Sequence, residues 1–343
     1  MQENKLNSTP LVSIILPVYY GEKFLAESIE SCLNQTHHNI ELIIVYDFST
    51  DKTLEIASLY ATKDNRIKII NNPDKKNLPA SLNVGHYVAK GDFITWTSDD
   101  NIFELDAIAV MLNTLLEKNV DIVYSDMIII DHNGDKVRDF DFLDFENIIF
   151  RNYFGNCFLY KKDVFERNNG YKEDRFLIED YDFWLRAITH SRFYQLRKKL
   201  YRYRKHNTSL THQIAVDNEK KQIFIENVIK MYNDFSKIFL ENDYLIMGDF
   251  LYKSLTYQKN PFEWIIDNER VINLFKQKLS HNINFQNKNV IEKVFLNKIV
   301  HLMVLDKGMK TNLSKSFYIV KKYGRFLDKK AVKTLIKYSF FKK

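Results

Sequence analysis

Several residue types and patterns are rare or missing in this chain, and each gap excludes a class of protein. Only two of the 343 residues are cysteines, Cys32 and Cys157, so a disulfide framework is excluded and a reducing compartment is indicated. No stretch approaches the ~18 consecutive apolar residues that cross a bilayer. The polar segment from Met1 to Pro10 does not look like a secretory signal. The sequence therefore predicts a cytoplasmic protein.

Phosphate sites built from glycine are missing as well. No Gly-x-Gly-x-x-Gly and no Walker-type loop follows any predicted strand, which excludes the dinucleotide fingerprint and the P-loop. Residues 18–22, after the first predicted strand, are not the glycine-rich basic loop that a nucleotidyltransferase would need. A nucleotide would instead be held by side chains and a metal ion.

What is present is typical of a globular protein with an unevenly placed charge. Hydrophobic residues make up 45% of the chain and charged residues 27%, with length enough for one large domain or two ordinary ones. The net charge is +6, but residues 306–343 hold twelve Lys and Arg against two Asp, so the rest of the chain sums to −4. The basic character therefore belongs to the tail.

The first half of the chain alternates between strand and helix patterns. Strands are expected at 12–17, 40–45, 66–70, 91–96 and 121–130, and helices at 22–34, from 50–53 onward, at 81–89 and at 104–118. Ser49 or Thr50 is the expected N-cap of the second helix, and Gly91 is expected to end the third. Asn133-Gly134 predicts a hairpin. Strands separated by such helices indicate right-handed βαβ units, and so an α/β fold.

The pattern changes twice after this region. Hairpins and short helices are expected as far as about Leu210, and helices dominate from about Ile214, where Gly and Pro are rare. We therefore predict an α/β catalytic domain over 1–212 and a smaller helical region over 213–343.

Carboxylates gather where predicted strands end. Asp99 and Asp100 follow the buried run that ends at Trp96, Asp47 follows the second strand, and a third cluster spans 179–182. Adjacent carboxylates near a core are costly unless a cation or hydrogen-bond donors compensate. The carboxyl ends of parallel strands are also where open α/β sheets bind ligands. Oxygen ligands of this kind suit Mg²⁺ or Mn²⁺ bound together with phosphates. Taken singly, each carboxylate could equally cap or begin a helix.

Several of these segments, in this order, resemble glycosyltransferase family 2 enzymes of the GT-A fold. The resemblance covers about residues 10–210. Its motifs lie at 12–19, 28–36, 41–51, 90–94, 98–101 and 179–186. It implies a Rossmann-like, mostly parallel sheet flanked by helices. It also implies an inverting transferase that uses a nucleotide-diphosphate sugar, most commonly a UDP-sugar, in the synthesis of a surface polysaccharide, capsule or lipid-linked oligosaccharide.

The resemblance assigns roles at the donor site. Pro17 and Tyr19 would line the nucleobase pocket, Asp47 would accept a hydrogen bond from the base, and Asp99 would contact the ribose. Asp100 would bind the Mn²⁺ or Mg²⁺ that bridges the diphosphate.

Further roles follow from the same resemblance. His206 is a possible second metal ligand, within a basic segment, 204–209, that would close over the diphosphate. Asp180 matches the general base that takes the proton of the acceptor hydroxyl. Glu179, Asp182 and Trp184 are candidate contacts for a glycan or lipid-linked acceptor, although Trp184 could equally be a core residue.

The chain departs from the usual family pattern at three positions. Thr97 stands where an acidic residue is common, so the metal would have one acidic ligand fewer. Tyr46 precedes Asp47 in place of a second Asp, and Phe48 follows it in place of a common Gly.

The basic tail predicts an amphipathic helix or helix pair. Its apolar residues recur near helical spacing, with lysines between them: Leu313, Phe317, Val320, Phe326, Leu327, Leu335 and Ile336. Such a tail could lie on an anionic membrane, which would make the protein peripheral on the inner face of the cell membrane. It could instead pack on the catalytic domain with its lysines in solvent. Nucleic acid is not expected as a partner, because no recognised module accompanies the charge.

One function of a different class stays open. The chain could be a non-catalytic, nucleotide-sugar-binding or membrane-attached assembly partner that keeps the fold, and the Thr97 substitution favours this alternative.

Overall fold

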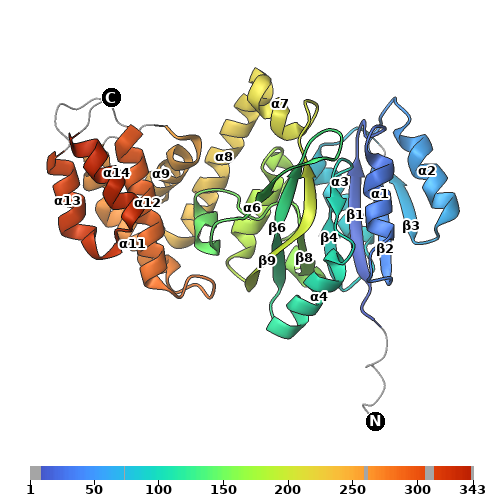
Figure 1. Ribbon diagram of the computed structural model, residues 1–343, viewed down its shortest axis with the longest axis horizontal. Coiled ribbons are helices and arrows are strands. Elements are labelled where there is room, and N and C mark those ends of the chain that lie inside the picture. The colour runs from blue at the N-terminus through green and yellow to red at the C-terminus, as the bar shows by residue number, and fades with distance from the viewer. Residues whose placement is uncertain (1–8, 73, 259–261, 306–312, 341–343) are drawn as a thin grey trace, which may run out of the picture. The chain divides into compact units, whose positions relative to one another are not determined.

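The computed structural model describes residues 9–72, 74–258, 262–305 and 313–340. By their internal contacts these residues form two compact units (Figure 1). The first runs to residue 144 and resumes over 152–227, and the second comprises 145–151 and the chain from 228 onward. Helix α7 (Leu210–Val216) belongs by its contacts to the first unit. The domain boundary at residue 212 remains a prediction from the sequence.

The first unit is built on one nine-stranded sheet in the order β3-β2-β1-β4-β8-β6-β9-β5, with β7 paired to β6. Its strands are β1 (Val12–Val18), β2 (Ile40–Tyr46), β3 (Ile67–Asn71), β4 (Phe93–Trp96), β5 (Ile102–Phe103), β6 (Ile122–Ile130), β7 (Lys136–Phe140), β8 (Phe158–Lys161) and β9 (Phe193–Arg204). Strands β1, β2, β3, β4, β6 and β9 run in one direction, and the other three run against them. The predicted α/β architecture with a mostly parallel sheet is confirmed.

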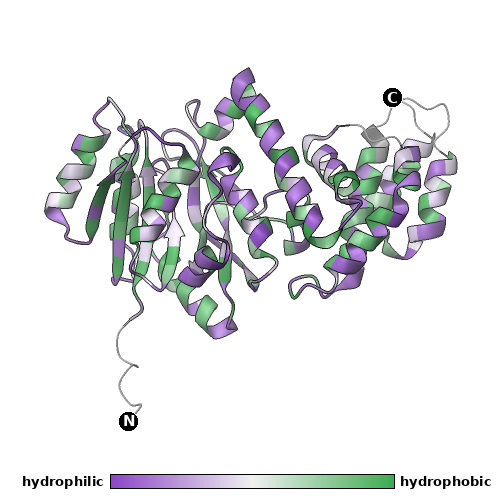
Figure 2. Ribbon diagram, turned by 180° about the vertical axis from the view of Figure 1, so that it is seen from behind, coloured by the Kyte–Doolittle hydropathy of each residue, from purple (hydrophilic) through white to green (hydrophobic). Residues whose placement is uncertain are grey.

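Helices cover both faces of this sheet. The helices of the first unit are α1 (Leu25–Leu33), α2 (Thr53–Lys63), α3 (Leu78–Val88), α4 (Ala107–Lys118), α5 (Lys162–Arg167), α6 (Glu179–Ala187) and α7, with a 3₁₀ turn, η2, at Glu173–Arg175. One face forms a continuous apolar core, in which Ile14 and Leu16 of β1 meet α1 and α4. On the other face, α3 approaches so closely that a Cβ at Gly85 would lie 2.5 Å from Ile15. The green strands of Figure 2 show how apolar this doubly covered sheet is.

Two predicted helix caps are wrong, for identifiable reasons. Helix α2 begins after Lys52, because Asp51 Oδ1 accepts from the backbone N–H of Thr53 at 3.2 Å. The hydroxyl of Ser49 serves the neighbouring loop instead. Helix α3 ends at Val88, and Ala89 is its C-cap. Gly91 is needed for space, since a Cβ there would lie 2.7 Å from the carbonyl oxygen of Leu11.

The predicted hairpin is confirmed, with Gly134 at φ +93° between β6 and β7.

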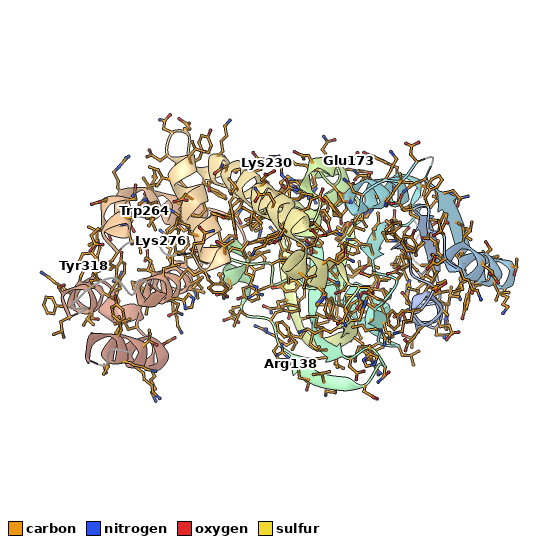
Figure 3. The ribbon with its side chains drawn as sticks, turned by 90° about the horizontal axis from the view of Figure 1, so that it is seen from above. Arg138, Glu173, Lys230, Trp264, Lys276 and Tyr318 are labelled. Atoms are coloured by element: carbon orange, nitrogen blue, oxygen red, sulfur yellow. The ribbon has the colours of Figure 1, made fainter. Side chains whose placement is uncertain are left out.

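The second unit is helical. It contains η1 (Phe145–Ile149), α9 (Tyr244–Thr256), α10 (Phe262–Asp267), α11 (Glu269–Leu279), α12 (Lys288–Leu305), α13 (Leu313–Tyr323), η3 (Gly324–Phe326) and α14 (Lys329–Phe340), and α8 (Asn218–Phe239) runs from the first unit into it. Its core is aromatic: Phe295 of α12 lies 4.9 Å from Phe150 and 6.4 Å from Phe250, between ring centroids. Lys276, labelled in Figure 3, is buried and paired with Glu292 at 2.7 Å. Of the tail lysines, Lys307, Lys310, Lys342 and Lys343 lie outside the described residues.

Candidate active site

The site lies at the edge where the parallel strands β1, β2 and β4 end. The loops after β1 and β2 are tied together there. The backbone N–H of Tyr20 donates to Ser49 Oγ at 2.8 Å, and that of Gly21 donates to Thr53 Oγ1 at 2.9 Å. Tyr20 and Phe48 both take left-handed backbone conformations, with φ of 54° and 57°. These turns redirect the chain directly after each strand, so that the side chains that follow face the same edge.

Asp47 is buried at the end of β2 and fixed by two donors. Its Oδ1 accepts from Asn72 Nδ2 at 2.8 Å and from the backbone N–H of Lys76 at 2.7 Å. Asn72 is itself buried, and its Oδ1 has no hydrogen-bond partner among the described residues. A buried acceptor without a donor costs roughly 1–3 kcal/mol, so a ligand that brings an N–H group to this point would be favoured.

An exposed aromatic lies after β1. Tyr19 is 42% exposed, its hydroxyl lies 2.5 Å from Lys75 Nζ, and that ammonium is 4.6 Å from the ring centroid. Pro17, two residues earlier, is half-buried and paired with Val45 of β2. Pro17 and Tyr19, the two predicted residues of the nucleobase pocket, therefore both lie at the end of β1, and the Tyr19 ring is accessible to a flat ligand.

Asp99 and Asp100 follow β4 but occupy different surroundings. The Asp99 carboxyl packs on the loop after β1, where a Cβ at Gly21 would be 2.4 Å from Asp99 Oδ2. Burial and the neighbouring Asp100 charge raise the pKa of Asp99 to about 8. The charged form of Asp99 is therefore disfavoured unless a ligand or cation compensates for its burial.

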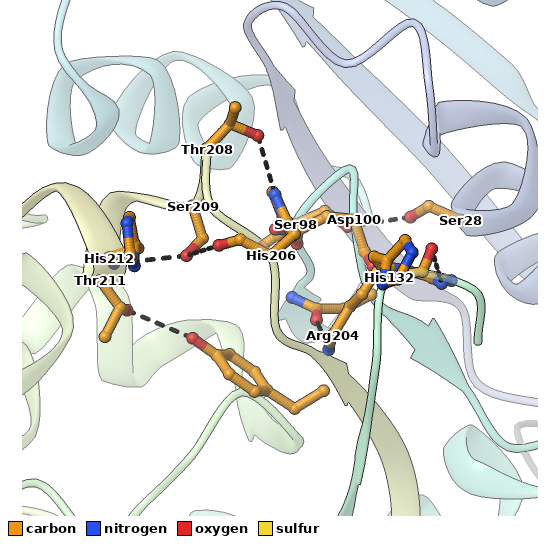
Figure 4. Close-up of polar contacts among 12 residues, drawn as sticks. Ser28, Ser98, Asp100, His132, Arg204, His206, Thr208, Ser209, Thr211 and His212 are labelled. Atoms are coloured by element: carbon orange, nitrogen blue, oxygen red, sulfur yellow. Dashed lines mark hydrogen bonds and ion pairs between the residues drawn. The ribbon is translucent and has the colours of Figure 1, made fainter. Parts of the chain in front are cut away.

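Asp100 is brought together with His206. Asp100 Oδ2 lies 2.8 Å from Nε2 of His206, whose Nδ1 lies 2.8 Å from Thr208 Oγ1 (Figure 4). Asp100 Oδ1 is buried and has no hydrogen-bond partner among the described residues. Thr97, in contrast, is fully buried and its hydroxyl is 2.6 Å from that of Tyr201, so it faces the interior.

The Asp100–His206 pair fits a cation that takes its other ligands from a bound nucleotide and from water. Within the described ranges, no cluster of three or more His, Cys, Asp or Glu could hold a metal ion. One carboxylate and one imidazole leave several positions for phosphate oxygens and water, which is how Mg²⁺ and Mn²⁺ are usually bound beside nucleotides. The unpartnered Asp100 Oδ1 is the observation that favours a cation here.

Arg204 supports this site from a buried position that differs from the predicted one. It was expected in the segment that closes over the diphosphate, but it is only 2% exposed. Its Nε donates to the carbonyl oxygen of Asp100 at 2.9 Å, and its guanidinium pairs with Glu27 and lies 4.5 Å from the Phe24 ring centroid. Arg204 therefore holds the backbone that carries Asp100 (Figure 4).

Asp180 lies in the first turn of α6 and is oriented by two donors. Its Oδ2 accepts from Asn152 Nδ2 at 2.7 Å, and its Oδ1 accepts from the backbone N–H of Tyr181 at 2.7 Å. Burial raises its pKa. The pKa of the Tyr203 phenol is raised first by burial and then by the charges of both Asp100 and Asp180.

The three candidate acceptor contacts differ in which internal partners their side chains have. Glu179 is buried, its Oε2 has no hydrogen-bond partner among the described residues, and burial raises its pKa to about 8. Asp182 is 2% exposed and pairs with Arg186 at 2.7 Å and with Arg175 at 3.5 Å. Trp184 is fully buried, stacked at 4.8 Å on Phe154. Of the three, Glu179 Oε2 and Trp184 Nε1 have no hydrogen-bond partner among the described residues, while Asp182 is committed to Arg186 and Arg175.

Asn152 and Arg204 are the residues that sequence reasoning missed or misplaced. Asn152 lies 28 positions before its partner Asp180, and no local pattern marks such a pair. The alternation of aromatic and basic residues in 201–204 was a usable signal for a strand reaching the site.

Comparison with known proteins decides the family. The profile of glycosyl transferase family 2 matches residues 13–168. A putative glycosyltransferase of Bacillus subtilis, EpsE, is 32% identical over 256 residues, which cover 71% of this chain and 88% of EpsE. This chain belongs to glycosyltransferase family 2.

Other relatives and solved structures agree with this assignment. An uncharacterized glycosyltransferase of Haemophilus influenzae is 37% identical over 129 residues, which are 38% of this chain and 52% of that protein, so the match spans about half of the relative. The crystal structure of S. aureus TarS 1-349 in complex with UDP-GlcNAc superposes with a TM-score of 0.57 at 18% identity, over 95% of this chain and 89% of the TarS 1-349 chain. This likeness confirms the predicted GT-A fold. No helix in the described part of the chain is long and apolar enough to cross a membrane.

Proposed function

We propose that this family 2 protein is an inverting glycosyltransferase. It moves a sugar from a nucleotide-diphosphate donor, a UDP-sugar, to a hydroxyl group of a glycan or lipid-linked acceptor during synthesis of a surface polysaccharide. The observation that carries the proposal is the Asp100–His206 pair at the end of β4, with 2.8 Å between Asp100 Oδ2 and His206 Nε2 and a buried Asp100 Oδ1 that has no hydrogen-bond partner among the described residues. A carboxylate and an imidazole with free ligand capacity suit a cation bound together with the phosphates of a donor.

The donor would bind along the strand ends. The nucleobase would lie by Pro17 and the Tyr19 ring, with its N–H groups directed toward Asp47 and Asn72, whose Oδ1 has no donor among the described residues. Asp99 would hydrogen-bond the ribose. The TarS structures solved with UDP-GlcNAc and with UDP support a UDP-linked donor on this fold.

Asp100 and His206 would hold Mn²⁺ or Mg²⁺. When bound, this ion supplies positive charge that stabilises the diphosphate as it leaves. Arg204 keeps Asp100 in place by holding its carbonyl oxygen.

Asp180 would act as the general base. The acceptor hydroxyl attacks the anomeric carbon on the side opposite the diphosphate. A new carbon–oxygen bond forms as the bond to the diphosphate breaks, and the hydroxyl proton passes to the Asp180 carboxylate. Asn152 and the Tyr181 N–H hold the two carboxylate oxygens in a fixed orientation for this transfer. A lipid-linked acceptor would place the protein on the inner face of the cell membrane.

A donor screen tests the proposal. Release of nucleoside diphosphate is followed across UDP-, GDP- and dTDP-sugars, with and without chelator, for the wild type and Asp180→Asn. We expect turnover with a UDP-sugar, loss of turnover with chelator, and a fall of about 10²–10⁴-fold in Asp180→Asn. Tight calorimetric binding of UDP with Mn²⁺, but no transfer or hydrolysis of any donor, would favour the non-catalytic alternative. Turnover at the wild-type rate in Asp180→Asn would refute the assigned base.

A further inference from the structure

Helices α13 and α14 form an antiparallel pair whose inner sides are well anchored. Ser316, near the start of α13, contacts Ser339, near the end of α14, with 2.6 Å between their hydroxyl oxygens. Ile319 and Leu335 are buried, at 0% and 3% exposure. Tyr318, labelled in Figure 3, donates to Glu269 of α11 at 3.1 Å. The pair is therefore a folded part of the second unit.

The outer side of the pair carries large apolar side chains in solvent. Five residues are at least two-fifths exposed: Leu313 (50%), Phe317 (68%), Val320 (51%), Val332 (41%) and Ile336 (50%). We call these five residues the apolar stripe. They recur at intervals of three or four residues on each helix, so each set lies along one side of its helix.

Both halves of the stripe lie on one side of the pair. A helical residue is rotated about 100° around the helix axis from the residue before it. Measured from Ser316, the stripe residues of α13 are rotated around their helix axis in one direction, and those of α14, measured from Ser339, are rotated in the same direction around theirs. Because the two helices are antiparallel and touch at Ser316 and Ser339, rotation in the same direction places both sets of residues on the same face of the pair. Figure 2 shows the mixture of apolar and polar residues around these two helices.

Exposed lysines accompany the stripe. Lys321, Lys329, Lys333 and Lys337 are exposed, and none has an acidic partner among the described residues. Two other lysines are used internally: Lys315 pairs with Glu263 at 3.4 Å, and Lys322 pairs with Glu269. Asp328 is the one acidic residue in 313–340. The surface around the stripe is therefore positively charged.

We propose that the apolar stripe and its four lysines form a docking surface for a bilayer containing anionic lipids. The apolar side chains enter the acyl boundary while the lysines meet the lipid phosphates. Apolar area and positive charge on one helical surface are what interfacial binding requires. This inference rests on the proposed function in one respect: a lipid-linked acceptor gives the transferase a reason to be at the membrane.

Vesicle flotation of the full chain tests the proposal. The vesicles are phosphatidylcholine alone or a three-to-one mixture with phosphatidylglycerol, at low and high salt. We expect binding to the anionic vesicles that weakens with salt, and little binding to phosphatidylcholine alone. Phe317→Glu should reduce the partition coefficient about tenfold or more. Lys329, Lys333 and Lys337 changed together to Gln should reduce it by on the order of a hundredfold, since each lysine near an anionic surface contributes about a fivefold factor.

Matched variants separate docking from general effects. Leu116→Glu alters an exposed apolar residue of α4 (50%, against 68% for Phe317), and the triple change of Lys63, Lys68 and Lys118 to Gln removes the same charge from the first unit. Both should bind vesicles like the wild type. Phe317→Trp places an additional indole in the stripe. A blue shift of its fluorescence emission on addition of anionic vesicles, relative to the wild type, would report insertion directly.

The readouts also separate this inference from the catalytic proposal. Circular dichroism should be unchanged in Phe317→Glu, and transfer to a water-soluble acceptor should keep the wild-type rate. Absence of wild-type binding to anionic vesicles would overturn the proposal. So would Phe317→Glu binding as well as the wild type, or a dimer that Phe317→Glu dissociates in the absence of lipid.

Discussion

His206 Nε2 lies 2.8 Å from Asp100 Oδ2, so an imidazole from the segment after β9 meets a carboxylate from the loop after β4. The two residues are 106 positions apart. Thr97, which stands where the family commonly has an acid, is directed into the core toward Tyr201. A metal at this point would therefore depend on the His206–Asp100 pair more than on the residues adjacent to Asp100.

The first prediction concerns this pair. His206→Ala should raise the Mn²⁺ concentration needed for half-maximal turnover by about 10–100-fold, while turnover at saturating Mn²⁺ changes less. A metal titration of nucleoside diphosphate release measures this. His212→Ala, which changes an exposed histidine of α7, is the control and should titrate like the wild type. Identical titrations for His206→Ala and wild type would exclude His206 as a ligand.

The second prediction concerns Asn152, which donates to Asp180 at 2.7 Å and thereby lowers the pKa of that carboxyl against the opposing effect of burial. Asn152→Ala removes the donor, so the pKa of Asp180 rises further. A base must be ionised to work, so the acidic limb of the kcat/KM profile should move to higher pH by roughly half to one unit.

The profile separates an electrostatic role from a structural one. Loss of packing alone would lower kcat/KM at every pH without moving the limb. Asn289→Ala, an exposed change in α12, serves as the control. An unmoved limb in Asn152→Ala would show that Asn152 does not set the ionisation of the base.

The third prediction concerns Glu179, whose pKa burial raises to about 8. An acid with a raised pKa holds its proton more tightly in the folded than in the unfolded state. Its contribution to stability therefore falls as pH rises from its ordinary value toward 8. Glu179→Gln removes this penalty. Its Tm relative to wild type should increase from about pH 5 to about pH 8, by roughly 3 °C for each kcal/mol.

Thermal unfolding across this pH range, followed by circular dichroism, measures the difference. Glu166→Gln, an exposed change in α5, should give a constant difference in Tm. If Glu179→Gln also gave a constant difference, Glu179 would be ionised in the folded protein throughout.

The strands that carry the donor site were predictable because they are buried on both faces. Continuous apolar runs mark β1, β2 and β4, and such runs have few alternatives in an α/β protein. Strand β9 was not predicted, since it is rich in Lys and Arg and only Leu200, Tyr201 and Arg204 within it are buried. Its assignment depends on β6, with which it pairs in parallel.

The residues of the candidate site likewise fall into those that could be predicted from the sequence and those that could not. Asp47, Asp99 and Asp100 could be found because they directly follow predictable strands. The partners that orient the carboxylates could not, because Asn152 and Arg204 act across 28 and 104 positions of sequence. The α2 cap failed for a similar reason: the Ser49 hydroxyl is used by Tyr20, a residue of another loop. Contacts between loops depend on strand order, which local patterns do not encode.

The last prediction decides what Asp182 does. It is 2% exposed between Arg186 and Arg175, so its removal would leave two guanidinium groups without their buried counter-ion. Asp182→Ala should lower the free energy of unfolding by about 3–5 kcal/mol, measured by urea denaturation. Asp163→Ala breaks an ion pair with Arg167 in which Asp163 is 56% exposed, and should cost less than about 1 kcal/mol. If Asp182→Ala instead kept wild-type stability and raised only the KM for the acceptor, Asp182 would be an acceptor contact. Because this carboxylate already neutralises two cations inside the protein, we expect the loss of stability.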